Sequence, residues 1–243
     1  MPHFIIKSEN IKRKVINISD KDLYKHIIKV MRSKPGEKIL FLDENKIQYE
    51  TILKNIESDY FTCNIISRYK SNRVLNINLY AAQSVLNSDA QISAVQKATE
   101  LGVKGIFPLC TDNCSVKKSV IESKIDKWQK IAFESVKQCE RADIPKVYNL
   151  TNLEELTDKF EQIIVFAESD TDRNFFEYLK ENPIDKTKDI LIIIGPEGGF
   201  SRAEFDYFNR KNLPLITLGN LIYRADTALT AAITTIINGV CYE

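Results

Sequence analysis

Residues 189–204 of the chain read Asp-Ile-Leu-Ile-Ile-Ile-Gly-Pro-Glu-Gly-Gly-Phe-Ser-Arg-Ala-Glu. The apolar run that ends at Ile194 is typical of a central strand in a parallel sheet. Three glycines follow within residues 195–199, and they allow the backbone to approach another group closely. Ser201 and Glu204 have the spacing of a capping box, which predicts the start of a helix. The stretch therefore predicts a ligand-binding turn at the carboxyl edge of a parallel sheet, where α/β proteins bind ligands.

This glycine stretch differs from the common phosphate-binding loops. No Lys-Ser or Lys-Thr pair follows the glycines, and the spacing is not that of the dinucleotide motif G-x-G-x-x-G. A phosphate ligand is therefore not favoured, and a purely structural turn is the alternative interpretation.

A second stretch, residues 218–232, ends another predicted strand at Gly219 and continues as a short apolar loop with a single cation, Arg224. Asp226 or Thr227 is expected to cap the helix that follows, which is apolar almost all round and is therefore expected to be buried. Apolar side chains beside glycine-rich backbone suit a flat, uncharged ring such as adenine, whose edges backbone N–H and C=O groups can read.

Outward from these stretches, apolar strands alternate with helices over residues 74–239, which indicates a parallel sheet covered on both faces. Before a boundary at residues 69–73, short alternating strands with one helix indicate a small β-barrel-like domain. Ser19 or Asp20 is expected to cap that helix, and its apolar face is predicted to consist of Leu23, Ile27, Val30 and Met31. The predicted strands are 3–6, 37–42, 47–54, 60–67, 74–81, 104–109, 162–167, 189–194 and 214–218, and the predicted helices are 20–31, 88–101, 119–139, 173–181, 201–211 and 226–239.

Composition and charge exclude a disordered chain. The 243 residues are 44% hydrophobic with a net charge of +1, so the chain can bury a core without a disulfide or metal. Residues 1–72 hold 14 Lys and Arg against 9 Asp and Glu, a net of +5, which leaves −4 for residues 73–243. A basic small domain fits a reader of a phosphate backbone, and a solvated surface without a partner is the alternative.

Neither a membrane nor a metal is expected as a partner. No apolar run reaches the ~18 residues of a membrane span, and the N-terminal stretch lacks the apolar region of a signal peptide, so a cytoplasmic protein is expected. The five cysteines contain no C-x-x-C pair, so buried free thiols are predicted rather than a zinc site.

The two stretches together, GPEGGFS-x-x-E and LG-x-x-x-x-R-x-[DE]-T-A, resemble the RsmE family. Members of this family use S-adenosylmethionine to methylate N3 of a uridine in 16S (small-subunit) ribosomal RNA, and they belong to the knotted SPOUT superfamily. Further matching motifs lie at Lys97–Val103, at Trp128–Ile131, at Gln138–Pro145 and at His26–Gly36.

The resemblance implies an α/β fold with two domains. Residues 1–72 would form a PUA-like RNA-binding β-barrel domain. Residues 73–243 would form a SPOUT methyltransferase domain, with a parallel sheet and a C-terminal trefoil knot. A homodimer acting on small-subunit ribosomal RNA or the assembled 30S subunit is implied, without a metal or membrane. The implied cofactor contacts are Ala167, Glu168, Gly195, Glu197, Gly198, Leu218, Gly219, Leu221, Ile222, Arg224, Thr227 and Ala228.

Arg224 is the candidate catalytic residue. Uridine N3 carries a proton, and a cation near O2 or O4 of the base would favour the attacking anion. The alternative for Arg224 is a structural ion pair with Asp226 or Glu197, and for Glu197 itself a structural role is favoured. In the small domain, Lys25, Lys29 and Arg32 are the candidate RNA contacts. His26 is predicted to be a core histidine on the face of Leu23 and Val30.

Several positions depart from the family pattern. His3, Asn113 and Leu221 stand where the family usually has Arg, Asp226 stands where it usually has Glu, and residues 83–90 lack the usual cation. Three of these changes remove charge that would meet RNA. Two alternatives to an active 16S methyltransferase therefore stay open. One is a catalytically impaired RNA-binding homologue, and the other is a SPOUT methyltransferase acting on another RNA.

Overall fold

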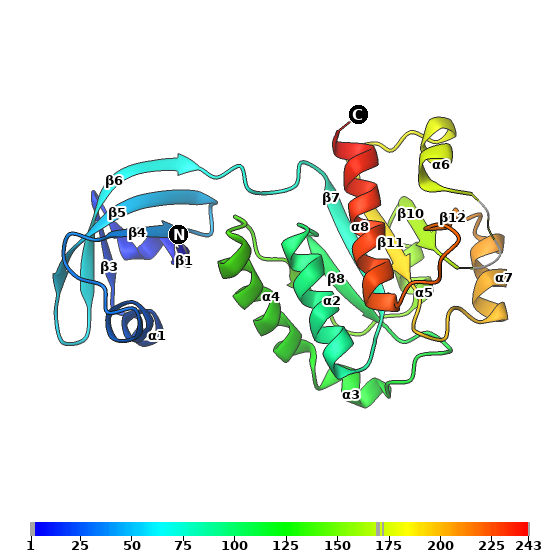
Figure 1. Cartoon of the computed structure of the whole chain (residues 1–243), viewed down its shortest axis with the longest axis horizontal. Helices are drawn as coiled ribbons and strands as arrows, with labels where there is room; N and C mark the ends of the chain where they lie inside the picture. Colours follow the sequence, from blue (N-terminus) through cyan, green and yellow to red (C-terminus); the bar gives the residue numbers. More distant parts are fainter. Residues whose placement is uncertain (1–2, 169–170, 172, 243) are drawn as a thin grey trace. The chain divides into compact units, whose positions relative to one another are not determined.

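The computed structural model describes residues 3–168, 171 and 173–242 (Figure 1). The chain divides into two compact units. The first, here the N-terminal unit, contains residues 1–74 with 136–143, and the second, the C-terminal unit, contains residues 75–135 with 144–243.

The N-terminal unit is built on one six-stranded sheet with the order β1-β4-β5-β6-β3-β2. Its strands are β1 (His3–Ile5), β2 (Ile11–Lys12), β3 (Val15–Ile18), β4 (Lys38–Leu42), β5 (Ile47–Ile56) and β6 (Phe61–Lys70). The β1–β4 pair is parallel and the other pairs are antiparallel. The four predicted strands are confirmed. The short β2–β3 hairpin was not predicted, because its two- and four-residue strands are too short to show an alternating pattern.

The predicted helix 20–31 begins as expected but changes its geometry. Asp20 accepts hydrogen bonds from the backbone N–H groups of residues 22 and 23 and caps α1 (Lys21–Tyr24). The chain then continues as a π-helix over Lys25–Val30, in which Met31 N–H donates to the His26 carbonyl five residues earlier. A π-helix bonds i to i+5 and so rotates the later residues away from α-helical positions.

This rotation makes part of the predicted apolar face wrong. Ile27 is fully buried, but Val30 is 64% exposed and Met31 is 45% exposed. His26 is exposed and not a core residue, and its ring meets the edge of Phe4 with 5.7 Å between ring centroids.

The C-terminal unit contains a second six-stranded sheet with the order β12-β10-β11-β7-β8-β9, and every neighbouring pair is parallel. Its strands are β7 (Asn78–Ser84), β8 (Gly105–Leu109), β9 (Lys146–Val147), β10 (Gln162–Phe166), β11 (Asp189–Ile194) and β12 (Leu215–Ile216). The apolar strand β11 lies between β10 and β7, as predicted for a central strand.

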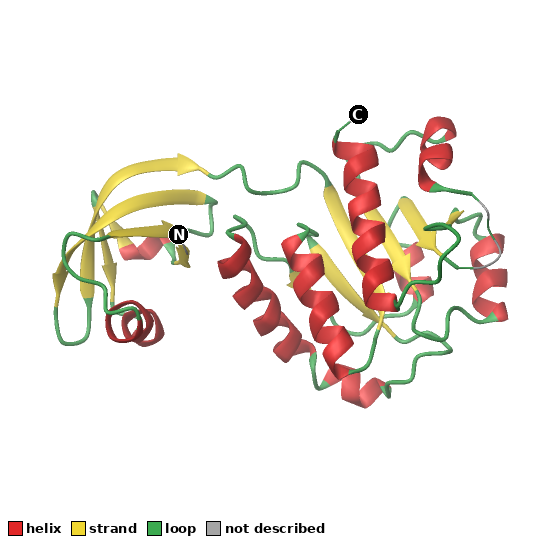
Figure 2. Ribbon diagram, viewed as in Figure 1, coloured by secondary structure: helices red, strands yellow, loops and turns green. Residues whose placement is uncertain are grey.

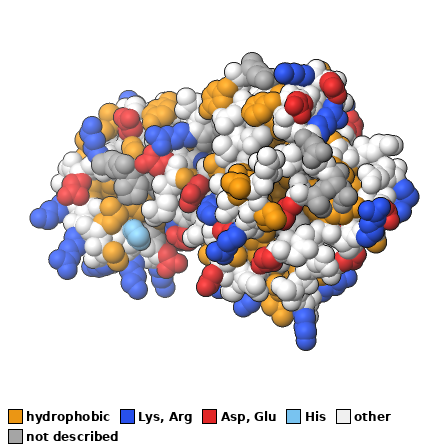
Figure 3. Space-filling model, turned by 45° about the vertical axis from the view of Figure 1, so that its right-hand side comes forward, with side chains coloured by type: hydrophobic (Ala, Val, Ile, Leu, Met, Phe, Trp, Pro, Cys, Tyr) orange, Lys and Arg blue, Asp and Glu red, His pale blue; other side chains and the backbone are white. Residues whose placement is uncertain are grey.

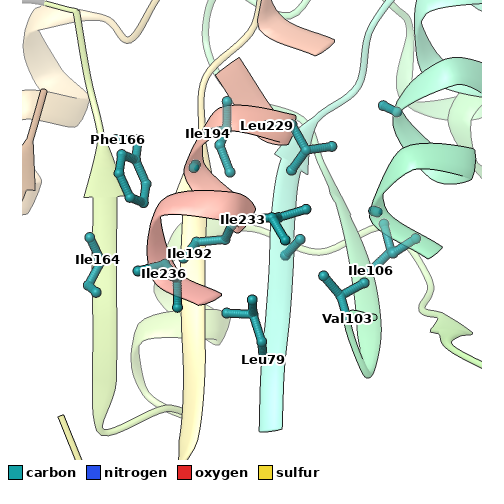
Figure 4. Packing of buried hydrophobic residues seen from close by; sticks show 14 of the residues in the cluster. Leu79, Val103, Ile106, Ile164, Phe166, Ile192, Ile194, Leu229, Ile233 and Ile236 are labelled. Atoms are coloured by element: carbon teal, nitrogen blue, oxygen red, sulfur yellow. The ribbon is translucent and has the colours of Figure 1, made fainter. Parts of the chain in front are cut away.

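Helices cover both faces of this sheet (Figure 2). They are α2 (Ser88–Glu100), α3 (Lys118–Glu122), α4 (Ile125–Cys139), α5 (Leu153–Thr157), α6 (Phe175–Glu181), α7 (Arg202–Arg210) and α8 (Ala225–Cys241). Because side chains alternate along a strand, Ile192 and Ile194 of β11 join the core beneath α8 (Figure 4). Leu191 and Ile193 join the opposite core with Phe205 and Phe208 of α7.

Some predicted boundaries need correction. The strand predicted at 74–81 lies at Asn78–Ser84, and the helix predicted at 119–139 breaks into α3 and α4. The strand predicted at 214–218 has only two residues, and Thr217 instead forms a parallel bridge with Asn174. Arg224 precedes α8 without a side-chain cap, so the expected capping by Asp226 or Thr227 is wrong. The trefoil knot stays a prediction of the resemblance.

Candidate functional site

A cavity of about 370 Å³ opens at the carboxyl ends of β10, β11 and β12. Its size falls within the ~300–1,000 Å³ typical of small-molecule sites. Three loops and the start of α8 build it, because parallel strands bring their carboxyl ends to one edge of the sheet. The lining residues are Phe166, Ala167, Glu168, Ile194, Gly195, Pro196, Glu197, Gly198, Gly199, Phe200, Phe205, Thr217, Leu218, Gly219, Leu221, Ile222, Tyr223, Ala225 and Ala228.

The glycine loop after β11 is held at both ends. The side chain of Gln83, which is 1% exposed, donates to the Gly195 carbonyl over 2.9 Å. Ser201 Oγ accepts from Glu204 N–H, and the Glu204 carboxylate accepts from Ser201 N–H, so the predicted capping box is confirmed. Gly199 has φ +68°, a conformation that L-residues with a side chain adopt only with strain.

The loop after β12 is fixed by a parallel bridge and by its own side chain. Thr217 N–H donates to the Arg173 carbonyl over 3.0 Å, and Thr217 Oγ1 accepts from Gly219 N–H over 3.1 Å. Gly219 has φ +117°, which turns the chain toward the cavity rim. There the apolar side chains of Leu221 and Ile222 are 73% and 81% exposed.

These walls fit the flat, uncharged ring that the sequence predicts. The cavity offers apolar side chains and much backbone, including glycine backbone from two loops, with Glu168 and Glu197 as its charged lining residues. Apolar walls suit the faces of a flat ring, and backbone groups can read its edges.

A second cavity of about 240 Å³ adjoins the first and shares part of its lining, including Glu168 and Glu197. Arg224 and Asp226 lie in this second cavity. The two cavities therefore differ in the groups that line them. The first is largely apolar and backbone-lined, and the second carries the cation.

Arg224 is 83% exposed, and its Nε lies 3.9 Å from Asp226 Oδ1. The other oxygen, Asp226 Oδ2, lies 3.3 Å from Lys97 Nζ of α2. Burial by itself would raise the pKa of the Asp226 carboxyl, but the hydrogen bond and charge of Lys97, with a smaller effect from Arg224, hold it below the ordinary value. Lys97 is therefore the closer counter-charge of Asp226.

The structure brings most of the predicted cofactor contacts together. Ten of the twelve line the first cavity, namely Ala167, Glu168, Gly195, Glu197, Gly198, Leu218, Gly219, Leu221, Ile222 and Ala228. Arg224 lines the second cavity, and Thr227 is exposed on α8 and is absent from the lining of both. Their contact with a cofactor stays a prediction.

Sequence reasoning missed other lining residues. Pro196, Gly199 and Phe200 belong to the glycine stretch itself, so their position in that stretch already pointed to the site. Phe205 had no such signal, because it reaches the cavity only through the packing of α7.

The candidate RNA contacts lie in the N-terminal unit, where basic side chains are numerous on the face drawn in Figure 3. Lys25, Lys29 and Arg32 are all exposed. The Lys29 ammonium lies 5.8 Å from the centroid of the Tyr24 ring.

Two of the departing positions have local partners. The Asn113 side chain donates to the carbonyls of Gly198 and Gly199, and Asp226 pairs with Lys97. Leu221 is largely exposed at the cavity rim. His3 pairs through the backbone of β1 with Leu40.

Other candidate chemistry is limited in the part of the chain that the structure describes. No group of three or more His, Cys, Asp or Glu side chains is arranged to hold a metal ion there, and no helix there has the length and hydropathy to cross a membrane. Cys63 is buried, and burial raises its pKa to about 12. The other four cysteines are half-buried, so the prediction of buried thiols is confirmed for Cys63 alone.

Comparison with known proteins matches both parts of the chain. Residues 73–237 match a family described as an RNA methyltransferase domain, and residues 18–66 match one described as an RNA methyltransferase PUA domain. The Ribosomal RNA small subunit methyltransferase E of Buchnera aphidicola subsp. Schizaphis graminum is 30% identical over 96% of this chain and 94% of its own length. That of Bacillus subtilis is 27% identical over 87% of this chain and 85% of its own length.

A solved structure agrees with the fold. It is the Ribosomal RNA small subunit methyltransferase E of Neisseria gonorrhoeae bound to S-adenosyl methionine, with a TM-score of 0.83 and 23% identity, covering 99% of this chain and 98% of that chain. With the RNA methyltransferase match over more than half of the chain and a 30%-identical relative of nearly full length, this chain belongs to the RsmE family of ribosomal RNA small subunit methyltransferases.

Proposed function

We propose that this protein transfers a methyl group from S-adenosylmethionine to N3 of a specific uridine in 16S ribosomal RNA. The observation that carries the proposal is the cavity of about 370 Å³ that the two motif loops build at the carboxyl edge of the parallel sheet. We further propose that the enzyme acts as a homodimer in the cytoplasm, on the free RNA or on the assembled 30S subunit. The exposed apolar side chains of Leu221 and Ile222 beside the cavity support a site that a second copy completes.

The cavity fits S-adenosylmethionine by its chemistry. Apolar residues such as Ile194, Leu218 and Ala228 would contact the adenine ring, and backbone groups of the glycine loop and of residues 217–219 would read its polar edges. When bound, the cofactor supplies an electrophilic methyl group whose leaving sulfur becomes neutral. The protein therefore needs no counter-charge for a leaving anion, and its contribution is to align the two reactants.

Besides its predicted contact with the cofactor, Arg224 would act on the uridine. N3 of uridine gives up its proton to solvent before or during the attack, and the negative charge left on the base spreads over the ring carbonyls. A guanidinium beside O2 or O4 stabilises that charge. Because Lys97 lies closer to the Asp226 carboxylate, at 3.3 Å against 3.9 Å, the exposed Arg224 side chain retains its donors for RNA.

The two parts of the chain would divide the work. Residues 1–72, with a net charge of +5, would bind the ribosomal RNA through Lys25, Lys29 and Arg32. Residues 73–243 would bind the cofactor and carry out the transfer. The match of residues 18–66 to the PUA domain family supports this division.

The proposal is tested by mapping the modified uridine. Ribosomes from a deletion strain should lack one N3-methyluridine in 16S RNA by mass spectrometry, and the wild-type gene should restore it. The purified protein should bind S-adenosylmethionine in calorimetry and transfer a labelled methyl group to subunits from the deletion strain.

Other results would lead to the alternative functions. Cofactor binding with an unchanged 16S profile and a mark lost from another RNA would identify a methyltransferase of different substrate. RNA binding without measurable cofactor binding would identify a catalytically impaired homologue and refute the proposal.

A further inference from the structure

Asn113, which stands where the family usually has Arg, is bonded to the cavity loop. It lies in the loop after β8, and its side-chain amide donates to two consecutive carbonyls, Gly198 O over 3.2 Å and Gly199 O over 3.1 Å. The contact joins segments 85 residues apart in the sequence. One planar NH₂ group with two donors suits two neighbouring carbonyl oxygens.

Asp112, the residue before Asn113, bonds to the same loop nearer to α7. Asp112 N–H donates to Glu204 Oε1 over 3.0 Å, and the Asp112 carboxylate accepts from Ser201 Oγ over 2.5 Å. Glu204 is 7% exposed. Residues 112–113 therefore bond to the loop at its glycines and at the capping box that follows.

These bonds constrain which backbone groups face the cavity. Gly198 and Gly199 line the cavity, and Asn113 is absent from that lining. Each carbonyl bonded to Asn113 therefore points toward the loop after β8. Since the peptide is planar and trans, holding the Gly199 carbonyl directs the Phe200 N–H to the opposite edge of the same peptide. Gly199 N–H is already occupied by the Pro196 carbonyl over 3.0 Å.

We propose that Asn113 is a positioning residue for cofactor binding. It holds the Gly198 and Gly199 carbonyls outward, and it thereby keeps the glycine loop in the conformation that receives S-adenosylmethionine. The inference rests on the proposed function. It interprets Asn113 as a residue that supports the cofactor loop, and not simply as the loss of an RNA-binding Arg. Glycines at both positions make this support necessary, because glycine loses more conformational freedom on ordering than any other residue.

The decisive variant is Asn113→Asp, which keeps the shape of the side chain but removes both donors and places a carboxylate against two carbonyl oxygens. The dissociation constant and the KM for S-adenosylmethionine should each rise about tenfold or more, since two hydrogen bonds are lost. The KM for RNA should change less than about twofold, because phosphate contacts are untouched. The variant Asn113→Arg keeps N–H donors at this position, so its dissociation constant for S-adenosylmethionine should stay within about threefold of the wild-type value. Asn209→Asp, an exposed position on α7, is the control for the added charge.

Thermal melting and hydrogen exchange accompany the binding measurements, and Asn113→Ala serves if the Asp variant does not fold. Faster exchange of the peptide that contains residues 195–204, with the rest of the protein protected, supports the proposal. Unchanged affinity for S-adenosylmethionine in both Asn113→Asp and Asn113→Ala overturns the proposal. An equal loss of that affinity in Asn209→Asp overturns it as well. Wild-type protein that does not bind S-adenosylmethionine contradicts the proposed function itself, so the two failures are distinguishable.

Discussion

The pair formed by Lys97 of α2 and Asp226 of α8 allows a quantitative test of how the start of α8 is positioned. In the variant Lys97→Met, the side chain keeps most of its length and its preference for helix, but Asp226 loses its closer counter-charge. Lys97 is 39% exposed and Asp226 is 14% exposed, with 3.3 Å between Nζ and Oδ2.

The size of the effect follows from the distance and the exposure. Two unit charges 3.3 Å apart attract by about 5 kcal/mol at an effective dielectric constant of about 20. Desolvation of the Asp226 carboxylate and screening at the exposed Lys97 offset most of this. Fully exposed pairs contribute about 0.2–1 kcal/mol and broken buried pairs cost about 3–5 kcal/mol. For this half-buried pair we expect a loss of about 1–2 kcal/mol, or roughly 2–8 °C in Tm for a unit of this size.

The pKa shift of Asp226 determines how the stability contribution of this ion pair changes with pH. The pKa of Asp226 is lowered in the folded protein because Lys97 overcomes the effect of burial. The ion pair therefore stabilises the fold above the unfolded pKa of about 3.9, and the contribution is lost as the pH falls through the folded value. In Lys97→Met, burial is left largely unopposed, so the pKa of Asp226 should rise toward or above the unfolded value, and the acid-dependent loss of stability that this carboxylate contributes in wild type should become smaller or reverse. The difference in stability between wild type and the variant should therefore be full at neutral pH and shrink toward pH 3.

The assay is thermal unfolding between pH 3 and pH 8, together with methyl-transfer kinetics. Lys97→Arg should restore most of the stability, and Lys180→Met on α6, an exposed position, is the matched control. Adding Asp226→Asn should recover part of the loss, because it removes the uncompensated charge. We also expect a lower kcat with little change in cofactor affinity, since Arg224 becomes the remaining counter-charge of Asp226. A wild-type pH profile in Lys97→Met, or no coupling in the double variant, would refute the reasoning.

Three further predictions concern the cavity, the catalytic cation and the RNA. Gly199→Ala should weaken cofactor binding by about 1–2 kcal/mol in calorimetry. The cost is backbone strain alone, because φ is +68° and an added Cβ meets nothing within 4 Å. Gly198→Ala lacks the positive φ and should cost less, and equal losses in the two variants would contradict this reasoning. Arg224→Ala should lower kcat by about 10²-fold or more at unchanged cofactor affinity if it stabilises the uridine anion, and unaltered turnover in single-turnover kinetics would exclude that role. Lys29→Glu with Arg32→Glu should weaken RNA binding and reduce the slope of log affinity against log salt by about one for each phosphate that is no longer neutralised, whereas an unchanged slope would place the RNA elsewhere.

Much of the fold could be predicted from the sequence because its signals are local. The continuous apolar run of β11 and the capping box at Ser201 each lie within a few residues of chain, and the structure confirms both. The helix predicted at 20–31 shows the limit of such signals. Its apolar spacing was that of an α-helix, but a π-helix after Tyr24 rotates Val30 into solvent, and His26 is exposed as well.

The site shows the same division. The glycine stretch and residues 218–232 were recognised from spacing alone, since backbone turns and apolar loops depend on residue type at neighbouring positions. Phe205 was missed, and α8 was expected to start later than Ala225. Both depend on how a helix packs against the sheet, which no short window of sequence contains.

The sequence by itself determined the longer strands of both sheets and the alternation of strands with helices in the C-terminal unit. It also determined the two loops that carry the site and the resemblance to the RsmE family. Only the tertiary structure decided which side chains support those loops: Gln83 at Gly195, Asn113 at Gly198 and Gly199, and Lys97 at Asp226. These partners lie between 85 and 129 residues apart along the chain. Local patterns record backbone preference and burial, whereas a hydrogen bond or ion pair between distant segments depends on strand order and helix packing, which place the two atoms within about 3 Å of each other.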